Sequence, residues 1–165
     1  MIEYFDNVFS TAIVEEINTL LRRPKWSFNG GGLAYDGDFV SNFWHMDHLE
    51  EEDYFLNLFE NIKEKLFKDQ TVKIVRCYAN GQTAGQSGVP HRDDGDVTVL
   101  YFPTRWKHHL GGHLNFVSNN SIKSLVEYKQ NRLVKFNSEI VHYSSAPVYN
   151  YIGLRISLAY KVKII

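Results

Sequence analysis

His91 and Asp93 lie two residues apart in Pro90-His91-Arg92-Asp93, just ahead of an apolar run with the composition of a β-strand. Successive side chains of a strand point to opposite faces, so this imidazole and this carboxylate can project to the same side and bind one ion. Arg92 then points away. The spacing supplies two ligands of a metal site, and a third must come from elsewhere in the chain.

A second triplet of the same form, His45-Met46-Asp47, shows that spacing alone decides little. With seven His and nine Asp in 165 residues, chance alone predicts about 0.4 such triplets. The surrounding residues must therefore distinguish the two.

His142 and Arg155 complete the chemistry near the C-terminus. His142 lies in a short apolar run, where a lone histidine is most often a buried structural residue. In the following run, 153–160, alternation places Arg155 and Ser157 on one face and apolar side chains on the other. An arginine on the inner face of a strand needs an anion, and an adjacent hydroxyl can add a hydrogen bond to a carboxylate.

Two histidines and one carboxylate with open coordination positions form the facial arrangement of non-haem Fe(II) oxygenases. With these parts in this order, the sequence resembles the 2-oxoglutarate- and Fe(II)-dependent oxygenases, specifically the prolyl-4-hydroxylase-like branch. The matching segments are Tyr78-Ala79-Asn80-Gly81-Gln82, His91-Arg92-Asp93, Gly111-Gly112-His113-Leu114-Asn115-Phe116, His142 and Arg155-Ile156-Ser157.

The resemblance implies that His91, Asp93 and His142 are catalytic residues that bind Fe(II). It also implies that 2-oxoglutarate, the cosubstrate, chelates the iron while Arg155 holds its far carboxylate, assisted by Ser157 and Tyr78. Together with O₂, the site would hydroxylate an unactivated C–H bond and release succinate and CO₂. The implied substrate is a prolyl or other residue of a peptide or protein, and the alternative is a free amino acid or other small metabolite.

The resemblance also separates the two triplets. His45-Met46-Asp47 lacks the preceding Tyr-x-x-Gly-Gln segment, and an acidic stretch, 50–53, follows it instead of a strand. We predict that this second triplet binds no metal.

The elements expected around the site make a mainly β fold of the α+β class. Two amphipathic helices are predicted, at 10–23 and from about residue 50. Short runs rich in Val, Ile, Tyr and Phe predict strands at 72–79, 97–103, 111–117, 122–128, 132–137, 140–146 and 153–163. These elements fit a jelly roll, the double-stranded β-helix of the resembling family, with the N-terminal helices packed on one face.

A length of 165 residues fits a single domain, 1–165. Residues 1–70 would form a helical support with an aromatic, Gly-rich loop, and 71–165 the jelly-roll core. Within the first part, 25–48 strings Trp26, Phe28, Phe43 and Trp44 around Gly30-Gly31-Gly32, and we expect it to cover the mouth of the barrel. The alternative is a structural role, in which these aromatic side chains pack beneath the helices.

Composition limits the partners. A net charge of −1 shows none of the excess positive charge that favours binding to nucleic acid or to an anionic membrane. A lone cysteine, Cys77, and no run approaching a membrane span favour a soluble cytoplasmic protein. Two other classes remain open: a non-catalytic jelly-roll binding or structural protein, which would not need Arg155 and Ser157, and a cupin-like metalloenzyme, which more often carries His-x-His with a Glu.

Overall fold

The computed structural model describes residues 1–30 and 41–165. Its helices are α1 (Thr11–Leu20) and α2 (Asp53–Leu66), with single 3₁₀ turns at η1 (Leu49–Glu51) and η2 (His108–Leu110). The strands are β1 (Ile2–Asp6), β2 (Ser27–Gly30), β3 (Phe43–Met46), β4 (Val72–Gln82), β5 (Val97–Phe102), β6 (Leu114–Ser118), β7 (Ser121–Val126), β8 (Arg132–Asn137), β9 (His142–Ser144) and β10 (Arg155–Ile164).

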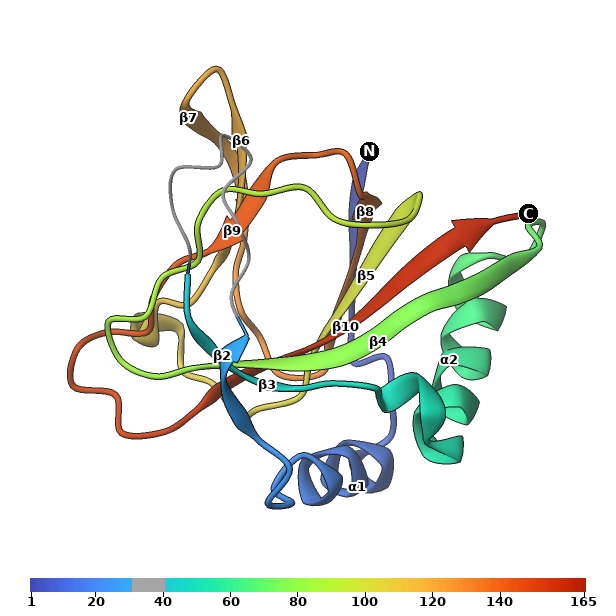
Figure 1. Ribbon diagram of the computed structural model, residues 1–165, viewed down its shortest axis with the longest axis horizontal. Helices are drawn as coiled ribbons and strands as arrows, with labels where there is room; N and C mark the ends of the chain where they lie inside the picture. The colour runs from blue at the N-terminus through green and yellow to red at the C-terminus, as the bar shows by residue number, and fades with distance from the viewer. Residues whose placement is uncertain (31–40) are drawn as a thin grey trace.

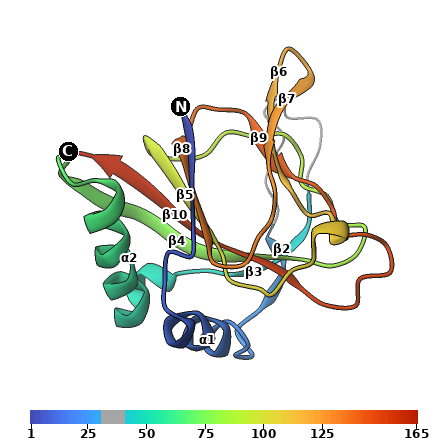
Figure 2. The ribbon, with the colours of Figure 1, turned by 180° about the vertical axis from the view of Figure 1, so that it is seen from behind.

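Two antiparallel sheets face each other and form the predicted jelly roll. The larger sheet has the order β1-β8-β5-β10-β4-β3-β2, and the smaller one has the order β7-β6-β9. In Figures 1 and 2 the smaller sheet lies opposite the middle of the larger one, with the β6–β7 hairpin projecting beyond it. The fold class expected from the sequence is confirmed.

The larger sheet has a core on each of its faces. On the outer face, Ile156, Leu158 and Tyr160 of β10 pack against buried residues of α1 and α2. On the inner face, Ala159 joins a second apolar cluster that fills the space between the sheets. The side chains of β10 alternate between the two faces, so every second one packs under the helices, and Arg155, Ser157 and Lys161 face the space between the sheets.

Both helices lie on the outer face of the larger sheet, as predicted (Figure 1). Ser10 caps α1 by accepting a hydrogen bond from the Ile13 amide, and α2 buries Phe55, Leu58, Phe59 and Ile62 at helical spacing. Neither helix of the described residues combines the length and apolarity that a membrane span requires.

The N-terminal part also adds strands at both edges of the larger sheet. β1 pairs with β8 at one edge, while β3 pairs with β4 at the other and carries β2 outward. The sequence did not indicate β1, because three of its five residues are exposed and no alternation marks the run.

An ion-paired carboxylate fastens β1 to the sheet. Asp6 accepts hydrogen bonds from Arg132 Nε at 2.7 Å and Nη2 at 3.0 Å, and from Lys129 Nζ at 2.8 Å. The hydrogen bond from Arg132, helped by Lys129 and opposed by partial burial, lowers the pKa of the Asp6 carboxyl from 3.8 to about 2.

We expect Asp6→Asn to lower the free energy of unfolding at pH 7 by about 1–2 kcal/mol. Because the folded-state pKa is depressed, this stabilisation is present above pH 4 and disappears as the pH falls toward 2. Urea titrations from pH 7 to pH 2 would measure it. Glu3→Gln on the same strand, where no ion pair forms within the described residues, should change little. A difference between Asp6→Asn and wild type that stays constant down to pH 2 would contradict the ion-pair explanation.

Candidate metal and cosubstrate site

Three side chains from two distant segments of the chain meet at the inner face of the larger sheet. His91 and His142 exchange backbone hydrogen bonds of 3.0 Å in both directions, which places the segment before β5 beside the start of β9. Potential ligand atoms of His91, Asp93 and His142 all lie within 4.8 Å of one another. The structure therefore brings together the three residues that the sequence singled out as metal ligands.

The two histidines are held in the same tautomer by local carbonyls. His91 Nδ1 lies 2.8 Å from Val89 O, and His142 Nδ1 lies 2.8 Å from Ile140 O. A carbonyl can only accept, so each Nδ1 carries the proton and each Nε2 presents a lone pair. The Nε2 atoms face Asp93, at 3.5 Å from Oδ1 for His91 and 3.2 Å from Oδ2 for His142. Burial lowers the pKa of His142, which favours the neutral form that binds metals.

Asp93 is a buried carboxylate with cationic and polar neighbours. Its Oδ2 accepts a hydrogen bond of 2.7 Å from Thr98 Oγ1 and is in contact with the ammonium group of Lys161. Burial alone would raise the pKa of the Asp93 carboxyl, but its charged and polar neighbours, led by Lys161, outweigh burial and hold the pKa well below its usual range. Asp93 is therefore charged, as a metal ligand must be.

Arg155 is buried in the same pocket. Its side chain is 1% exposed, and its Nε donates a hydrogen bond of 2.8 Å to the carbonyl of Gly112. The guanidinium lies over the rings of Tyr128, at 4.6 Å, and Phe102, at 5.5 Å. Among the described residues no carboxylate pairs with it, and burial lowers its pKa to about 10. A buried cation of this kind fits an anion that enters from the pocket.

Ser157 and Tyr78 line this pocket but are placed differently with respect to Arg155. Ser157 follows Arg155 on the same face of β10. Tyr78 pairs with Ala159 in the sheet register, and its hydroxyl bonds to Lys161. Tyr78 thus lies toward the Asp93 end of the pocket, and the aromatic neighbours of Arg155 are Tyr128 and Phe102.

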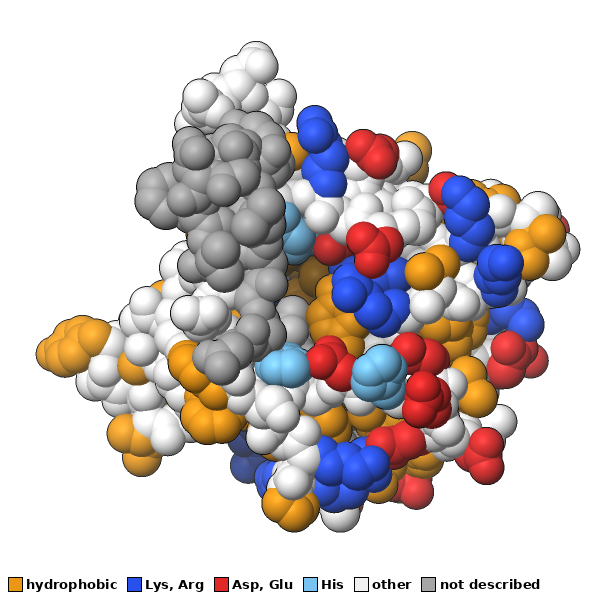
Figure 3. Space-filling model, in the orientation of Figure 1, with side chains coloured by type: hydrophobic (Ala, Val, Ile, Leu, Met, Phe, Trp, Pro, Cys, Tyr) orange, Lys and Arg blue, Asp and Glu red, His pale blue; other side chains and the backbone are white. Residues whose placement is uncertain are grey.

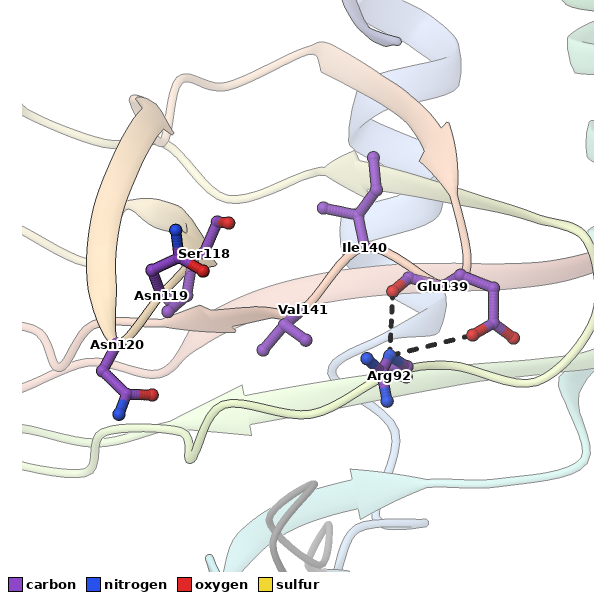
Figure 4. A pocket seen from close by; sticks show the side chains of 8 residues that line it. Arg92, Ser118, Asn119, Asn120, Glu139, Ile140 and Val141 are labelled. Atoms are coloured by element: carbon purple, nitrogen blue, oxygen red, sulfur yellow. Dashed lines mark hydrogen bonds and ion pairs between the residues drawn. The ribbon is translucent and has the colours of Figure 1, made fainter.

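Arg92 points away from the triad, as strand alternation predicts. Its Nε donates to Glu139 O at 3.1 Å, and the side chain borders a hollow on the outside of the β6–β7 and β9 region (Figure 4). Arg92 is therefore no part of the pocket that holds Arg155.

The second triplet forms a pair, not a cluster. His45 Nδ1 lies 2.5 Å from Asp47 Oδ2, and both side chains reach the surface. Together with His48, Glu50 and Glu51 they belong to a patch of histidine and acidic side chains over β3 and η1 (Figure 3). Within residues 1–30 and 41–165, the group of three potential metal ligands is His91, Asp93 and His142.

The aromatic side chains of 25–48 pack in different places. Trp26 packs against the helix-side core, and Phe28 and Trp44 contact each other at 5.2 Å near the surface. Phe43 alone of these four lines the pocket of the triad. Gly31, Gly32 and Phe39 lie outside the described residues, so the expectation that 25–48 covers the barrel mouth stays a prediction.

Solved structures share this arrangement of strands, although no family model matches the sequence and no curated protein is detectably similar to it. A 2OG-Fe(II) oxygenase family oxidoreductase from Burkholderia pseudomallei superimposes with a TM-score of 0.76 at 14% identity, covering 98% of this chain and 84% of the other. The fold is that of the 2-oxoglutarate- and Fe(II)-dependent oxygenases.

Two further similar structures contain bound molecules of different kinds. A prolyl hydroxylase from Trichoplax adhaerens, in complex with a hypoxia inducible factor peptide fragment, matches with a TM-score of 0.72 at 14% identity, covering 99% of this chain and 83% of the other. HygX from Streptomyces hygroscopicus, with nickel, 2-oxoglutarate and hygromycin B bound, matches with a TM-score of 0.76 at 11% identity, covering 98% and 82%. The shared fold therefore accommodates a peptide in one protein and a small molecule in another.

Lys161 is the pocket residue that sequence reasoning missed. The alternation that places Arg155 and Ser157 inward continues through Ala159 to Lys161, so the signal was present. A lysine near the end of a chain is most often solvated, whereas this one is 1% exposed.

Proposed function

We propose that this protein is a Fe(II)- and 2-oxoglutarate-dependent dioxygenase that hydroxylates an unactivated C–H bond, with succinate and CO₂ as co-products. One observation carries the proposal: a His-Asp-His cluster shares a single pocket with a buried arginine that has no counter-ion among the described residues. A non-catalytic jelly-roll protein would have no use for that combination, since burying an unpaired cation is costly.

The donor set fits Fe(II). Two neutral imidazole nitrogens and one carboxylate oxygen suit a metal of intermediate hardness, and three protein ligands leave positions for other ligands. His91 and His142 would bind through Nε2 and Asp93 through its carboxylate, with ring orientations fixed by the carbonyls of Val89 and Ile140. When bound, iron with 2-oxoglutarate and O₂ supplies the oxidising chemistry.

The remaining pocket residues would bind and orient the cosubstrate. Arg155 would hold the far carboxylate of 2-oxoglutarate, and Ser157 would add a hydroxyl donor from the same strand face. Tyr128 stacks on the guanidinium, and its hydroxyl bonds to Ile156 O, so the ring helps to keep Arg155 in place. Leu100 and Leu114 supply apolar walls that limit water in the pocket.

The proposed substrate is a prolyl or other residue of a peptide or protein, with a free amino acid or small metabolite as the alternative. Both classes have precedent in the peptide and the antibiotic bound by the two oxygenase structures described above. Phe43 and Ser144 also line the pocket, and one apolar and one polar side chain suit either class.

Cosubstrate binding and turnover test the proposal in two steps. Anaerobic addition of Fe(II) and 2-oxoglutarate should produce a weak visible charge-transfer band. A mass-spectrometric screen of peptides, amino acids and metabolites, run with O₂, should then find a product that has gained one oxygen atom, with one succinate formed per product. Absence of the band with both components at millimolar concentration would overturn the proposal.

A further inference from the structure

Lys161 lies where three strands of the larger sheet meet. On β10 it pairs with Thr98 of β5 on one side and Arg76 of β4 on the other. Directly opposed residues in an antiparallel sheet project to the same face, so Lys161 and Thr98 reach the inner face together. Both end at one atom, Oδ2 of Asp93, and Lys161 also bonds to the Tyr78 hydroxyl.

The two carboxylate oxygens of Asp93 therefore have different surroundings. Oδ2 is held by Thr98 Oγ1 at 2.7 Å and by Lys161, and His142 Nε2 lies 3.2 Å from it. Among the described residues, Oδ1 has one close polar neighbour, His91 Nε2 at 3.5 Å. Thr98 and Lys161 thus hold one carboxylate oxygen, Oδ2, whereas Oδ1 faces His91.

A chain would gain little by burying a lysine here for stability alone. Desolvation of an ammonium group costs several kcal/mol, and an apolar residue of similar volume is often as stabilising as a buried ion pair. Lys161 is 1% exposed, and its carboxylate partner is a residue of the triad, not a structural acid elsewhere. The buried pair is explained if Lys161 controls the orientation of the Asp93 carboxylate.

We propose that Lys161 is a positioning residue that holds Oδ2 of Asp93, so that Asp93 binds the metal through Oδ1 alone. Thr98 assists as the neutral partner of the same oxygen. A one-oxygen ligand leaves three of six coordination positions open, enough for a bidentate cosubstrate and one further ligand. The inference rests on the proposed function, because it requires that the triad binds a divalent metal.

Removing the ammonium group should change both the geometry and the strength of metal binding. In Lys161→Met the freed Oδ2 can turn toward the ion, and a competing positive charge is lost. We expect the variant to bind Mn(II) at least about tenfold more tightly than wild type. We also expect it to retain one fewer exchangeable water on the bound ion.

The probe is Mn(II) alone, without cosubstrate or turnover. Electron paramagnetic resonance titration gives the affinity, and water-proton relaxation of the bound ion gives the number of exchangeable waters. Lys161→Arg keeps the charge and the donor, and should restore the wild-type water count. Thr98→Val removes only the neutral donor and should shift the water count in the same direction as Lys161→Met, by less.

Each outcome decides between positioning and a purely structural role. An unchanged water count in Lys161→Met would overturn the inference, even with tighter binding, because only the charge and not the carboxylate would then matter. If Lys161→Met folds only in the presence of Mn(II), the ion has replaced the lysine as the partner of Asp93, which supports the inference. Failure to fold with Mn(II) present would count against it. If the wild-type protein binds no Mn(II) at all, the proposed function fails as well, which separates the two failures.

Discussion

Replacing Arg155 with glutamine should weaken 2-oxoglutarate binding by about 100-fold while leaving the affinity for Fe(II) or Mn(II) within about twofold of wild type. Arg155 has no ion-pair partner among the described residues, so its charge is available to the cosubstrate. A charge-assisted hydrogen bond contributes about 1.5–3 kcal/mol, and a far carboxylate left buried without a cation adds to the loss. Calorimetric titration of the metal-loaded protein with 2-oxoglutarate measures it.

The choice of glutamine limits the structural damage. Arg155 Nε donates to the carbonyl of Gly112, and the glutamine amide can still donate there, whereas alanine would also open a cavity in a fully buried place. Arg155→Lys serves as the matched control: it keeps the charge but loses the two-pronged geometry, and should recover part of the affinity.

An unchanged affinity for 2-oxoglutarate in Arg155→Gln would mean that another cation holds the far carboxylate. Two other cations of the larger sheet already have partners: Arg76 pairs with Asp94 at 3.0 Å, and Lys135 donates to Leu66 O at 2.9 Å. Lys161 would then be the remaining cation that lines the pocket in the described residues.

Asp93→Ala should destabilise the fold as well as remove the metal. The substitution leaves the ammonium group of Lys161 buried without its partner, and breaking a buried pair in this way typically costs about 3–5 kcal/mol. A loss of metal binding by this variant alone would therefore be ambiguous.

Asp93→Asn combined with Lys161→Met removes both charges and keeps similar volumes. We expect the free energy of unfolding of the double variant to lie within about 1 kcal/mol of the wild-type value, since an apolar replacement of a buried pair is often neutral. Its affinity for Mn(II) should nevertheless fall by at least about 1,000-fold, because two neutral imidazoles are left without a charged ligand. Thermal unfolding and Mn(II) titration by electron paramagnetic resonance measure the two effects separately.

The second triplet provides the control for that experiment. Asp47→Asn removes a carboxylate at the same spacing from a histidine, but one that faces the surface in the patch over β3. Mn(II) affinity should be unchanged. If Asp47→Asn abolished metal binding and the double variant at 93 and 161 did not, the metal would bind at His45 and not at the triad.

The sequence alone determined the larger part of the fold and of the candidate site. Strand alternation placed Arg155 and Ser157 on the inner face of β10, because β10 is buried on both sides and its pattern is regular. The order of His91, Asp93 and His142 relative to Arg155 indicated the triad, and the structure brings those ligands within 4.8 Å. These inferences depend on local periodicity and on order along the chain, both of which are written in the sequence.

Only the tertiary structure decided how the inner residues pair with one another. The contact between Lys161 and Asp93, and the stacking of Tyr128 on Arg155, depend on the register between strands that are far apart in the chain. Likewise, β1 pairs with β8, and Asp6 reaches Arg132, 126 positions away. Register is set by the packing of two cores around the larger sheet, and a shift of one residue would exchange its inner and outer faces, so no local pattern can specify these partners.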